Sequence, residues 1–128
     1  MMNPADPRMV AIVDDDESVR TALLGLLRST GLPAKAFASA EEFLASLASN
    51  EQQHVACLIA DIRMPGMSGL ELQAELNSRN LRIPTIFITA HGDTNMKMQA
   101  LRAGAAEFLI KPFRDDVLLE QVRVALES

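Results

Sequence analysis

The stretch VACLIADIRMPGMSG, residues Val55–Gly69, decides the fold. It opens with an uninterrupted apolar run, Val55–Ala60, which is typical of a strand buried on both faces of a parallel sheet. The run ends in a single carboxylate, Asp61, and the residues Met64–Gly69 include Pro and Gly and cannot continue a strand. We therefore expect Asp61 to be held by a rigid element while facing solvent, a position that suits a nucleophile or a metal ligand.

Composition limits the classes of protein to be considered. The chain has 128 residues, the size of one domain, and 48% of them are hydrophobic, which is enough for a single core. Its formal net charge is −5, its Lys and Arg residues are scattered, and it has no Trp or Tyr to stack on bases. This chain alone should therefore bind nucleic acid poorly. No apolar run approaches the ~18 residues of a membrane helix, and no signal peptide is visible.

The single cysteine, Cys57, lies inside the expected buried strand. It cannot form an internal disulfide, which favours a reducing, cytoplasmic location, and we interpret it as a small core residue. Residues 1–8 contain two prolines and are expected to form a flexible tail before a single domain at residues 9–128.

Apolar runs of strand length alternate with segments of helical periodicity along the whole chain. The expected strands are Met9–Val13, Ala34–Phe37, Val55–Ala60, Thr85–Ile88 and Ala106–Ile110. The expected helices begin near Asp16, Ser39, Ser68, Asn95 and Asp115 or Asp116, and the expected loops include Asn50–His54 and His91–Asp93. This alternation predicts an α/β fold, a doubly wound (βα)5 three-layer sandwich around a parallel five-stranded sheet in the flavodoxin-like order 2-1-3-4-5.

Short motifs support the helix boundaries. The apolar residues of the first helix recur on one stripe, Val19, Ala22, Leu23, Leu26 and Leu27. Ser39 with Glu42, and Ser68 with Glu71, form the capping-box pattern that begins the second and third helices. Gly31 is expected to end the first helix.

Polar side chains follow four of the five expected strands. They are Asp14 and Asp15 after the first strand, Asp61 at the third, Thr89 at the fourth and Lys111 at the fifth. In a doubly wound sheet the site lies beyond the carboxyl ends of the strands, at the switch point between strands 1 and 3. Three clustered carboxylates repel one another and raise their own pKa values, and a divalent cation relieves this. Ligation by oxygen alone suits Mg²⁺ or Mn²⁺.

These groups fit phosphoryl transfer. Lys111 offers a compact positive charge, Thr89 offers a hydrogen bond, and Asp61 is the best candidate nucleophile because it is single and central. Taken alone, Asp14–Asp16 could simply begin a helix and Asp61 could sit in a turn. Thr89 could cap the next segment, and Lys111 could be solvated. Their joint occurrence at four strand ends favours a site.

The chain resembles the receiver domains of bacterial two-component response regulators, which have the CheY-like fold. The matching segments are IVDDDESVR (Ile12–Arg20), DIRMPGMSGLEL (Asp61–Leu72), PTIFITAHGD (Pro84–Asp93) and AGAAEFLIKPF (Ala103–Phe113). The resemblance covers Met9–Leu126, and the combination of motifs is highly specific. The last two segments are similar to the FixJ-like subfamily, whose members usually carry a C-terminal LuxR-type helix-turn-helix.

The resemblance implies a role for each residue of the acidic cluster. Asp61 would accept a phosphoryl group from the phosphohistidine of a cognate sensor histidine kinase. Asp15 would bind Mg²⁺ directly, and Asp14 would help through a water molecule. Arg63 would contribute its backbone carbonyl to the metal, so its side chain would matter less.

The resemblance also implies how phosphorylation would be sensed. Lys111 would contact the phosphoryl group and have a cis bond to Pro112, while Thr89 would follow the phosphoryl oxygen and draw in the next loop. The switch aromatic on the fifth strand is Phe108, where many relatives have Tyr. Because Phe108 has no hydroxyl, its ring could follow Thr89 by packing alone, and otherwise it is a plain core residue.

We therefore expect a phosphorylation-dependent signalling switch and not an enzyme beyond Mg²⁺-dependent self-phosphorylation and autodephosphorylation. Phosphorylation would shift the fourth helix, fifth strand and last helix to control homodimerisation or an output domain. No direct binding of nucleic acid or membrane by this chain is expected. No helix-turn-helix follows Ser128, so the chain is either a fragment cut before a DNA-binding domain, which the subfamily similarity favours, or a stand-alone regulator.

Two alternatives would use the same fold. A hydrolase with an aspartyl nucleophile usually has a second Asp two residues later as general acid, where this chain has Arg63, and no cap domain fits in 128 residues. A flavin-binding module predicts a phosphate-cradling loop rich in Ser, Thr and Gly after the first strand. This chain has the acidic run Asp14–Glu17 there.

Overall fold

The computed structural model describes residues 8–48, 54–90 and 94–127. The strands are β1 (Arg8–Val13), β2 (Ala34–Phe37), β3 (His54–Asp61), β4 (Thr85–Thr89) and β5 (Glu107–Ile110). The helices are α1 (Glu17–Ser29), α2 (Ala40–Ala48), α3 (Gly69–Ser78), α4 (Thr94–Arg102) and α5 (Asp115–Glu127).

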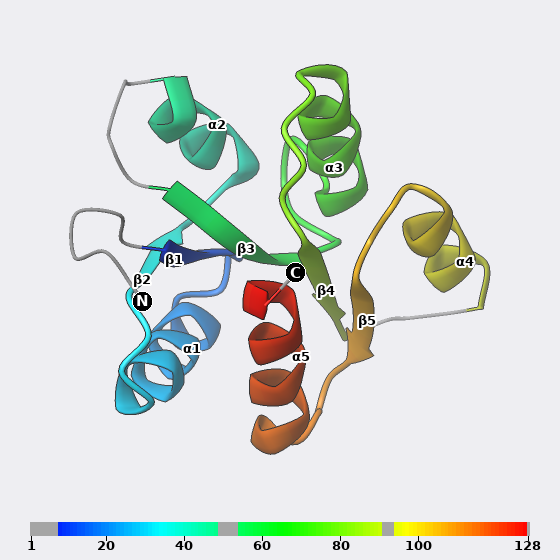
Figure 1. Ribbon diagram of the computed structural model, residues 1–128. Coiled ribbons are helices and arrows are strands. Elements are labelled where there is room, and N and C mark those ends of the chain that lie inside the picture. Colours follow the sequence, from blue (N-terminus) through cyan, green and yellow to red (C-terminus); the bar gives the residue numbers. More distant parts are fainter. Residues whose placement is uncertain (1–7, 49–53, 91–93, 128) are drawn as a thin grey trace.

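The strands form one parallel sheet in the order β2-β1-β3-β4-β5. Helices α1 and α5 lie on one face of the sheet, and α2, α3 and α4 lie on the other (Figure 1). This arrangement confirms the predicted doubly wound three-layer fold.

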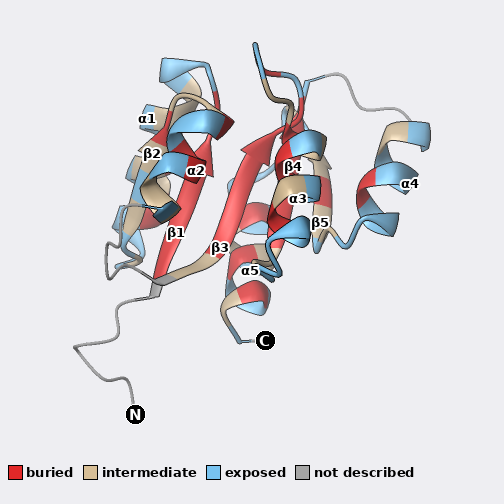
Figure 2. Cartoon of the chain, turned by 90° about the horizontal axis from the view of Figure 1, so that it is seen from above, coloured by how far each residue is buried: buried red, intermediate tan, exposed pale blue. Residues whose placement is uncertain are grey.

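Alternate residues of each inner strand pack into different hydrophobic clusters. In β1, Val10 and Ile12 pack with buried residues of α1 and α5, whereas Ala11 and Val13 pack with those of α2 and α3. Figure 2 shows the strands buried between two layers of helices whose outer surfaces are exposed. Because both faces of the sheet are covered, the strands read as continuous apolar runs.

Some expected boundaries and positions differ from the structure. Asp16 lies outside the first helix and is its N-cap, with an extended backbone. Of the apolar stripe predicted on α1, Leu23 and Leu27 are buried and Val19 and Leu26 pack partly against the core, whereas Ala22 is exposed. Strand β5 begins at Glu107, one residue later than expected. Residues 1–7 of the expected tail, and 50–53 and 91–93 of the expected loops, lie outside the described residues.

The capping signals match the observed helix starts. The Ser68 side chain accepts the N–H of Glu71 and the Glu71 side chain accepts the N–H of Ser68, so a full capping box begins α3. At α2, the Ser39 hydroxyl oxygen accepts the N–H of Glu42 at 3.1 Å. Among the helices within the described ranges, none has the length and apolar character needed to cross a bilayer.

Gly69 is required where α3 starts against the end of β3. A Cβ at this position would lie 2.4 Å from the carbonyl oxygen of Asp61 and 3.0 Å from the Cα of Ile62. Both are backbone atoms, so neither can turn aside as a flexible side chain would. The close approach therefore fixes α3 directly against Asp61.

We expect Gly69→Ala to lower the free energy of unfolding by about 2–3 kcal/mol, because the added methyl forces backbone apart. Gly25→Ala is the matched control: nothing lies within 4 Å of a Cβ there, and within α1 the change should stabilise by about 0.5–1 kcal/mol. Urea unfolding followed by circular dichroism measures both values. Equal stability of the two variants would contradict the packing role of Gly69.

Candidate functional site

The acidic residues meet because β1 and β3 are neighbours that end at the same level. Val13 pairs with Ala60 across the two strands. The next residues along the strands are Asp14 and Asp61. The apolar sequences that bury the strands therefore also place these two carboxylates side by side at the carboxyl edge of the sheet.

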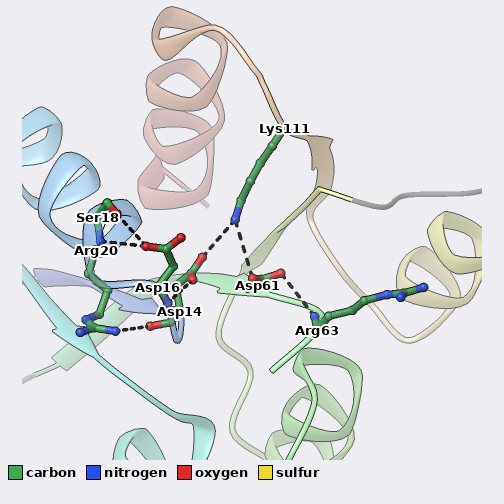
Figure 3. Close-up of polar contacts among 7 residues, drawn as sticks. All are labelled: Asp14, Asp16, Ser18, Arg20, Asp61, Arg63 and Lys111. Carbon is green, nitrogen blue, oxygen red and sulfur yellow. Dashed lines mark hydrogen bonds and ion pairs between the residues drawn. The ribbon is translucent and has the colours of Figure 1, made fainter. Parts of the chain in front are cut away.

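Three carboxylates and one ammonium form the centre of the site. Asp14, Asp15 and Asp61 each present an oxygen atom such that the three oxygens lie within 4.8 Å of one another. The Nζ of Lys111 lies 3.3 Å from Oδ2 of Asp14 and 3.7 Å from Oδ2 of Asp61 (Figure 3). The structure thus brings together four of the residues that the strand ends predicted.

Asp14 is fully buried and is held from several sides. Its Oδ1 accepts the N–H of Asp16 at 2.9 Å, while the Nη1 of Arg20 donates to its backbone carbonyl at 2.8 Å. Its Oδ2 faces Lys111. Asp15 is exposed, so the two neighbouring acids have different environments and Asp15 is the one open to solvent.

The side chain of Asp16 caps the helix and does not join the carboxylate cluster. Its side chain accepts hydrogen bonds from the backbone and hydroxyl of Ser18, both at 2.9 Å. The hydroxyl bond is the largest cause that lowers the pKa of the Asp16 carboxyl. The helix-start interpretation is therefore right for Asp16 but does not extend to Asp14.

The expectation that Asp61 faces solvent is wrong, since it is 8% exposed. Lys111 covers it on one side and the backbone N–H of Arg63 donates to its Oδ1 at 3.3 Å on another. Burial is the largest cause that raises the pKa of Asp61, and repulsion by Asp14 adds to it, while Lys111 and the Arg63 N–H oppose the rise. The repulsion that the sequence suggested is therefore real but is second to desolvation.

The donor set fits a hard divalent cation. Its ligand atoms would be carboxylate oxygens, which Mg²⁺ and Mn²⁺ prefer. The side chain of Arg63 points away from the cluster (Figure 3). Arg63 contacts Asp61 through its backbone N–H and not through its side chain.

Thr89 and Lys111 are joined through the backbone. Thr89 ends β4 and is buried, and it follows Ile88, the register partner of Asp61. The N–H of Lys111 donates to the carbonyl of Thr89 at 2.8 Å. The bond from Lys111 to Pro112 is cis, as the resemblance implied.

Phe108 is buried in β5, with 4% of its surface exposed. It pairs with Phe87 of β4 and belongs to the hydrophobic cluster that includes Ala100 of α4. Its ring therefore lies inside the core on the α4 side.

Two contacts of the site were not predicted from the sequence. Arg20 holds the carbonyl of Asp14 from the first turn of α1, and Glu41 of α2 accepts the N–H of Met67 in the loop after β3. The contact of Arg20 leaves a weak signal in the sequence, since an Arg placed one helical turn after an acidic run can reach back to that run. The contact of Glu41 has none, because 26 residues separate the partners.

Comparison with known proteins identifies the family. The family model described as the response regulator receiver domain matches residues 10–123. The chain is a response regulator receiver domain. Its fold agrees with that assignment, because the crystal structure of FixJ-N superposes with a TM-score of 0.84 and 41% sequence identity, covering 99% of this chain and 96% of that one.

The relatives of this receiver domain are longer proteins. It is 48% identical over 119 residues to nodulation protein W of Bradyrhizobium diazoefficiens, covering 93% of this chain and 51% of that protein. It is 45% identical over 118 residues to the transcriptional regulatory protein FixJ of Rhizobium meliloti, covering 92% and 56%. The receiver domain thus spans about half the length of the curated relatives it matches.

We expect Asp61→Asn to stabilise the receiver domain at neutral pH. The folded-state pKa of Asp61 lies above its ordinary value of 3.8, so ionisation disfavours the folded state, and removing the charge should add about 1 kcal/mol to the free energy of unfolding. The gain should shrink as the pH falls through the folded-state pKa and vanish below the ordinary one, because the wild-type carboxyl is then neutral in both states.

Chemical unfolding in EDTA at several pH values measures this difference. Glu75→Gln is the control, because Glu75 sits in an exposed ion pair with Arg79 and its loss should change stability by less than about 0.5 kcal/mol. If Asp61→Asn still has a higher free energy of unfolding than wild type at acidic pH, the charge of the Asp61 carboxylate is not the cause of the difference.

Proposed function

We propose that this receiver domain is the phosphoacceptor of a two-component system and that Asp61 receives the phosphoryl group. The observation that carries the proposal is the position of Lys111 Nζ between Asp14 and Asp61, at 3.3 and 3.7 Å. This ammonium adjoins a buried nucleophile and a set of cation ligands at one sheet edge. Such a combination suits the charge that develops in phosphoryl transfer.

In the proposed reaction, an oxygen of Asp61 attacks the phosphorus of a phosphohistidine on the partner kinase. The new P–O bond forms as the P–N bond breaks, and the electron pair of that bond stays on the imidazole nitrogen, which takes a proton from solvent. Lys111 holds one phosphoryl oxygen and the Thr89 hydroxyl donates to another. Attack of water on the same phosphorus later returns Asp61 to its carboxylate and releases inorganic phosphate.

Asp14, Asp15, Asp61 and the backbone carbonyl of Arg63 would hold Mg²⁺. When bound, the cation offsets the negative charge of the phosphoryl oxygens beside these carboxylates. The exposure of Asp15 and the burial of Asp14 support direct ligation by the first and an indirect role for the second.

We propose that phosphorylation shifts α4, β5 and α5 toward a state that binds a second copy or an output domain. The backbone link from Thr89 to Lys111 joins the site to β5. Five exposed large apolar side chains lie on these three elements: Met98, Leu101, Ile110, Val117 and Val124. The greater length of the relatives and the name of FixJ as a transcriptional regulatory protein support a DNA-binding output domain in the full protein. A histidine kinase partner and a cytoplasmic location belong to the same proposal.

The acceptor role predicts that acetyl phosphate with Mg²⁺ adds one phosphoryl group to the protein. Asp61→Asn should gain none, and wild type in excess EDTA should gain none on the same time scale. Intact-mass spectrometry at neutral pH reads all three samples. No gain in wild type, or an equal gain in Asp61→Asn, would refute the assignment.

The dimer face predicts a separable effect of Ile110→Glu. Ile110 is 50% exposed on β5, so a charge there should weaken phosphorylation-dependent dimerisation by about tenfold or more without unfolding the domain. Leu81→Glu is the control, since Leu81 is 37% exposed but precedes β4, outside this face. Sedimentation with and without acetyl phosphate measures the dimer. If both variants dimerise like wild type, α4-β5-α5 is not the interface.

A further inference from the structure

The loop of residues 62–68, between β3 and α3, is anchored at both ends beside the site. At its start, the N–H of Arg63 donates to Oδ1 of Asp61 at 3.3 Å. At its end, the Ser68 capping box begins α3, and the N–H of Gly69 donates to the carbonyl of Ile62 at 2.9 Å. The middle of the loop, at Pro65 and Gly66, is exposed.

A side chain from α2 reaches the middle of this loop. Oε2 of Glu41 accepts the N–H of Met67 at 3.1 Å. The same oxygen faces Gly66, where a Cβ would lie 2.7 Å from it. Gly66 also has φ +76, a left-handed conformation that favours glycine. The loop therefore fits closely under the Glu41 carboxylate.

We propose that Glu41 is a positioning residue that fixes this loop and thereby sets the affinity of the acidic cluster for its divalent cation. This inference rests on the proposed function, because the loop carries Arg63, whose carbonyl would be a cation ligand. Ile62 and Met64 of the loop belong to the buried hydrophobic cluster that includes Phe43 of α2. To this apolar packing Glu41 adds a hydrogen bond to Met67, next to the exposed residues of the loop. In this proposal, loss of the hydrogen bond loosens the exposed part of the loop, so that the Arg63 carbonyl is held less tightly relative to Asp61.

The contact is exposed, so its loss should act locally and not on the whole fold. Glu41 also places a negative charge in the first turn of α2, which favours the helix by itself. Glu42 lies in the same turn. Its backbone N–H donates to the Ser39 hydroxyl, and among the described residues no hydrogen bond joins its side chain to the loop. Glu42→Ala therefore removes the same charge from the same turn and leaves the loop alone.

The first experiment titrates Mg²⁺ into wild type, Glu41→Ala, Glu41→Gln and Glu42→Ala, with binding read from backbone amide shifts in NMR spectra. Glu41→Ala should weaken binding by roughly three- to tenfold, which corresponds to the loss of one hydrogen bond of ordinary strength, because the exposed position of this bond reduces the advantage of its charged acceptor. Glu41→Gln should recover part of this loss, because its amide oxygen can still accept from Met67. Glu42→Ala should bind like wild type and melt at the same temperature as Glu41→Ala. Equal Mg²⁺ affinities for Glu41→Ala and Glu42→Ala would overturn the proposal.

A second experiment uses the contact between Glu41 and Gly66. An added methyl in Gly66→Ala would displace the Glu41 carboxylate and strain the backbone, whereas in the Glu41→Ala background it would only strain the backbone. The loss of Mg²⁺ affinity in the double variant should therefore be smaller than the product of the two single losses. Losses that multiply would show that the two residues act independently and would overturn the proposal.

Both experiments separate this inference from the proposed function. Cation affinity is measured without any phosphoryl donor. If wild type gains no phosphoryl group, the acceptor role fails while the affinities still decide the role of Glu41. If wild type is phosphorylated and the Glu41 variants bind Mg²⁺ normally, the positioning role alone fails.

Discussion

The cost of burying two carboxylates at the end of an apolar sheet is the constraint on which the rest of the site depends. Asp14 is fully buried and Asp61 is 8% exposed. Removing these charges from water is unfavourable unless cations and hydrogen-bond donors compensate. Lys111, the N–H of Asp16 and the N–H of Arg63 supply part of that compensation. Burial and the nearby Asp14 carboxylate nevertheless raise the pKa of Asp61, the direction expected when the compensation is incomplete.

The apolar strands explain why these charges can sit nowhere else. Alternate residues of β1 and β3 pack into clusters on opposite faces of the sheet. A carboxylate within either strand would have no water and no cation beside it. At the carboxyl end, the loop after β3 brings the N–H of Arg63 within reach, and Lys111, which follows β5, brings its ammonium group. The burial that stabilises the fold thus confines the chemistry to one edge.

Local patterns predicted the strands, the fold class and the residues that meet at the edge. They could do so because each strand is one apolar run, and because parallel strands with helical crossovers place all carboxyl ends together. The burial of Asp14 and Asp61 was beyond these patterns, since residues distant in the sequence lie around them, such as Lys111, which is 97 residues from Asp14. The exposure of Ala22 was also missed, because helical periodicity identifies an apolar stripe but not how much of that stripe packs against the sheet. The contact between Glu41 and Met67 could not be predicted from local sequence, because it forms only when the tertiary structure brings α2 beside the loop.

The negative charge of Asp61 is only partly compensated, and in the proposed function this property links the unphosphorylated state to the phosphorylated one. In the proposed function, a site whose negative charge is disfavoured would attract a divalent cation, and the cation would offset the further negative charge of an added phosphoryl group. Lys111 would then share its single charge between Asp14 and the phosphoryl oxygens. Because its own N–H is bonded to the carbonyl of Thr89, any displacement of Lys111 is felt where β4 meets β5. In the proposed function, the electrostatic imbalance that makes Asp61 reactive is therefore also the source of the conformational change.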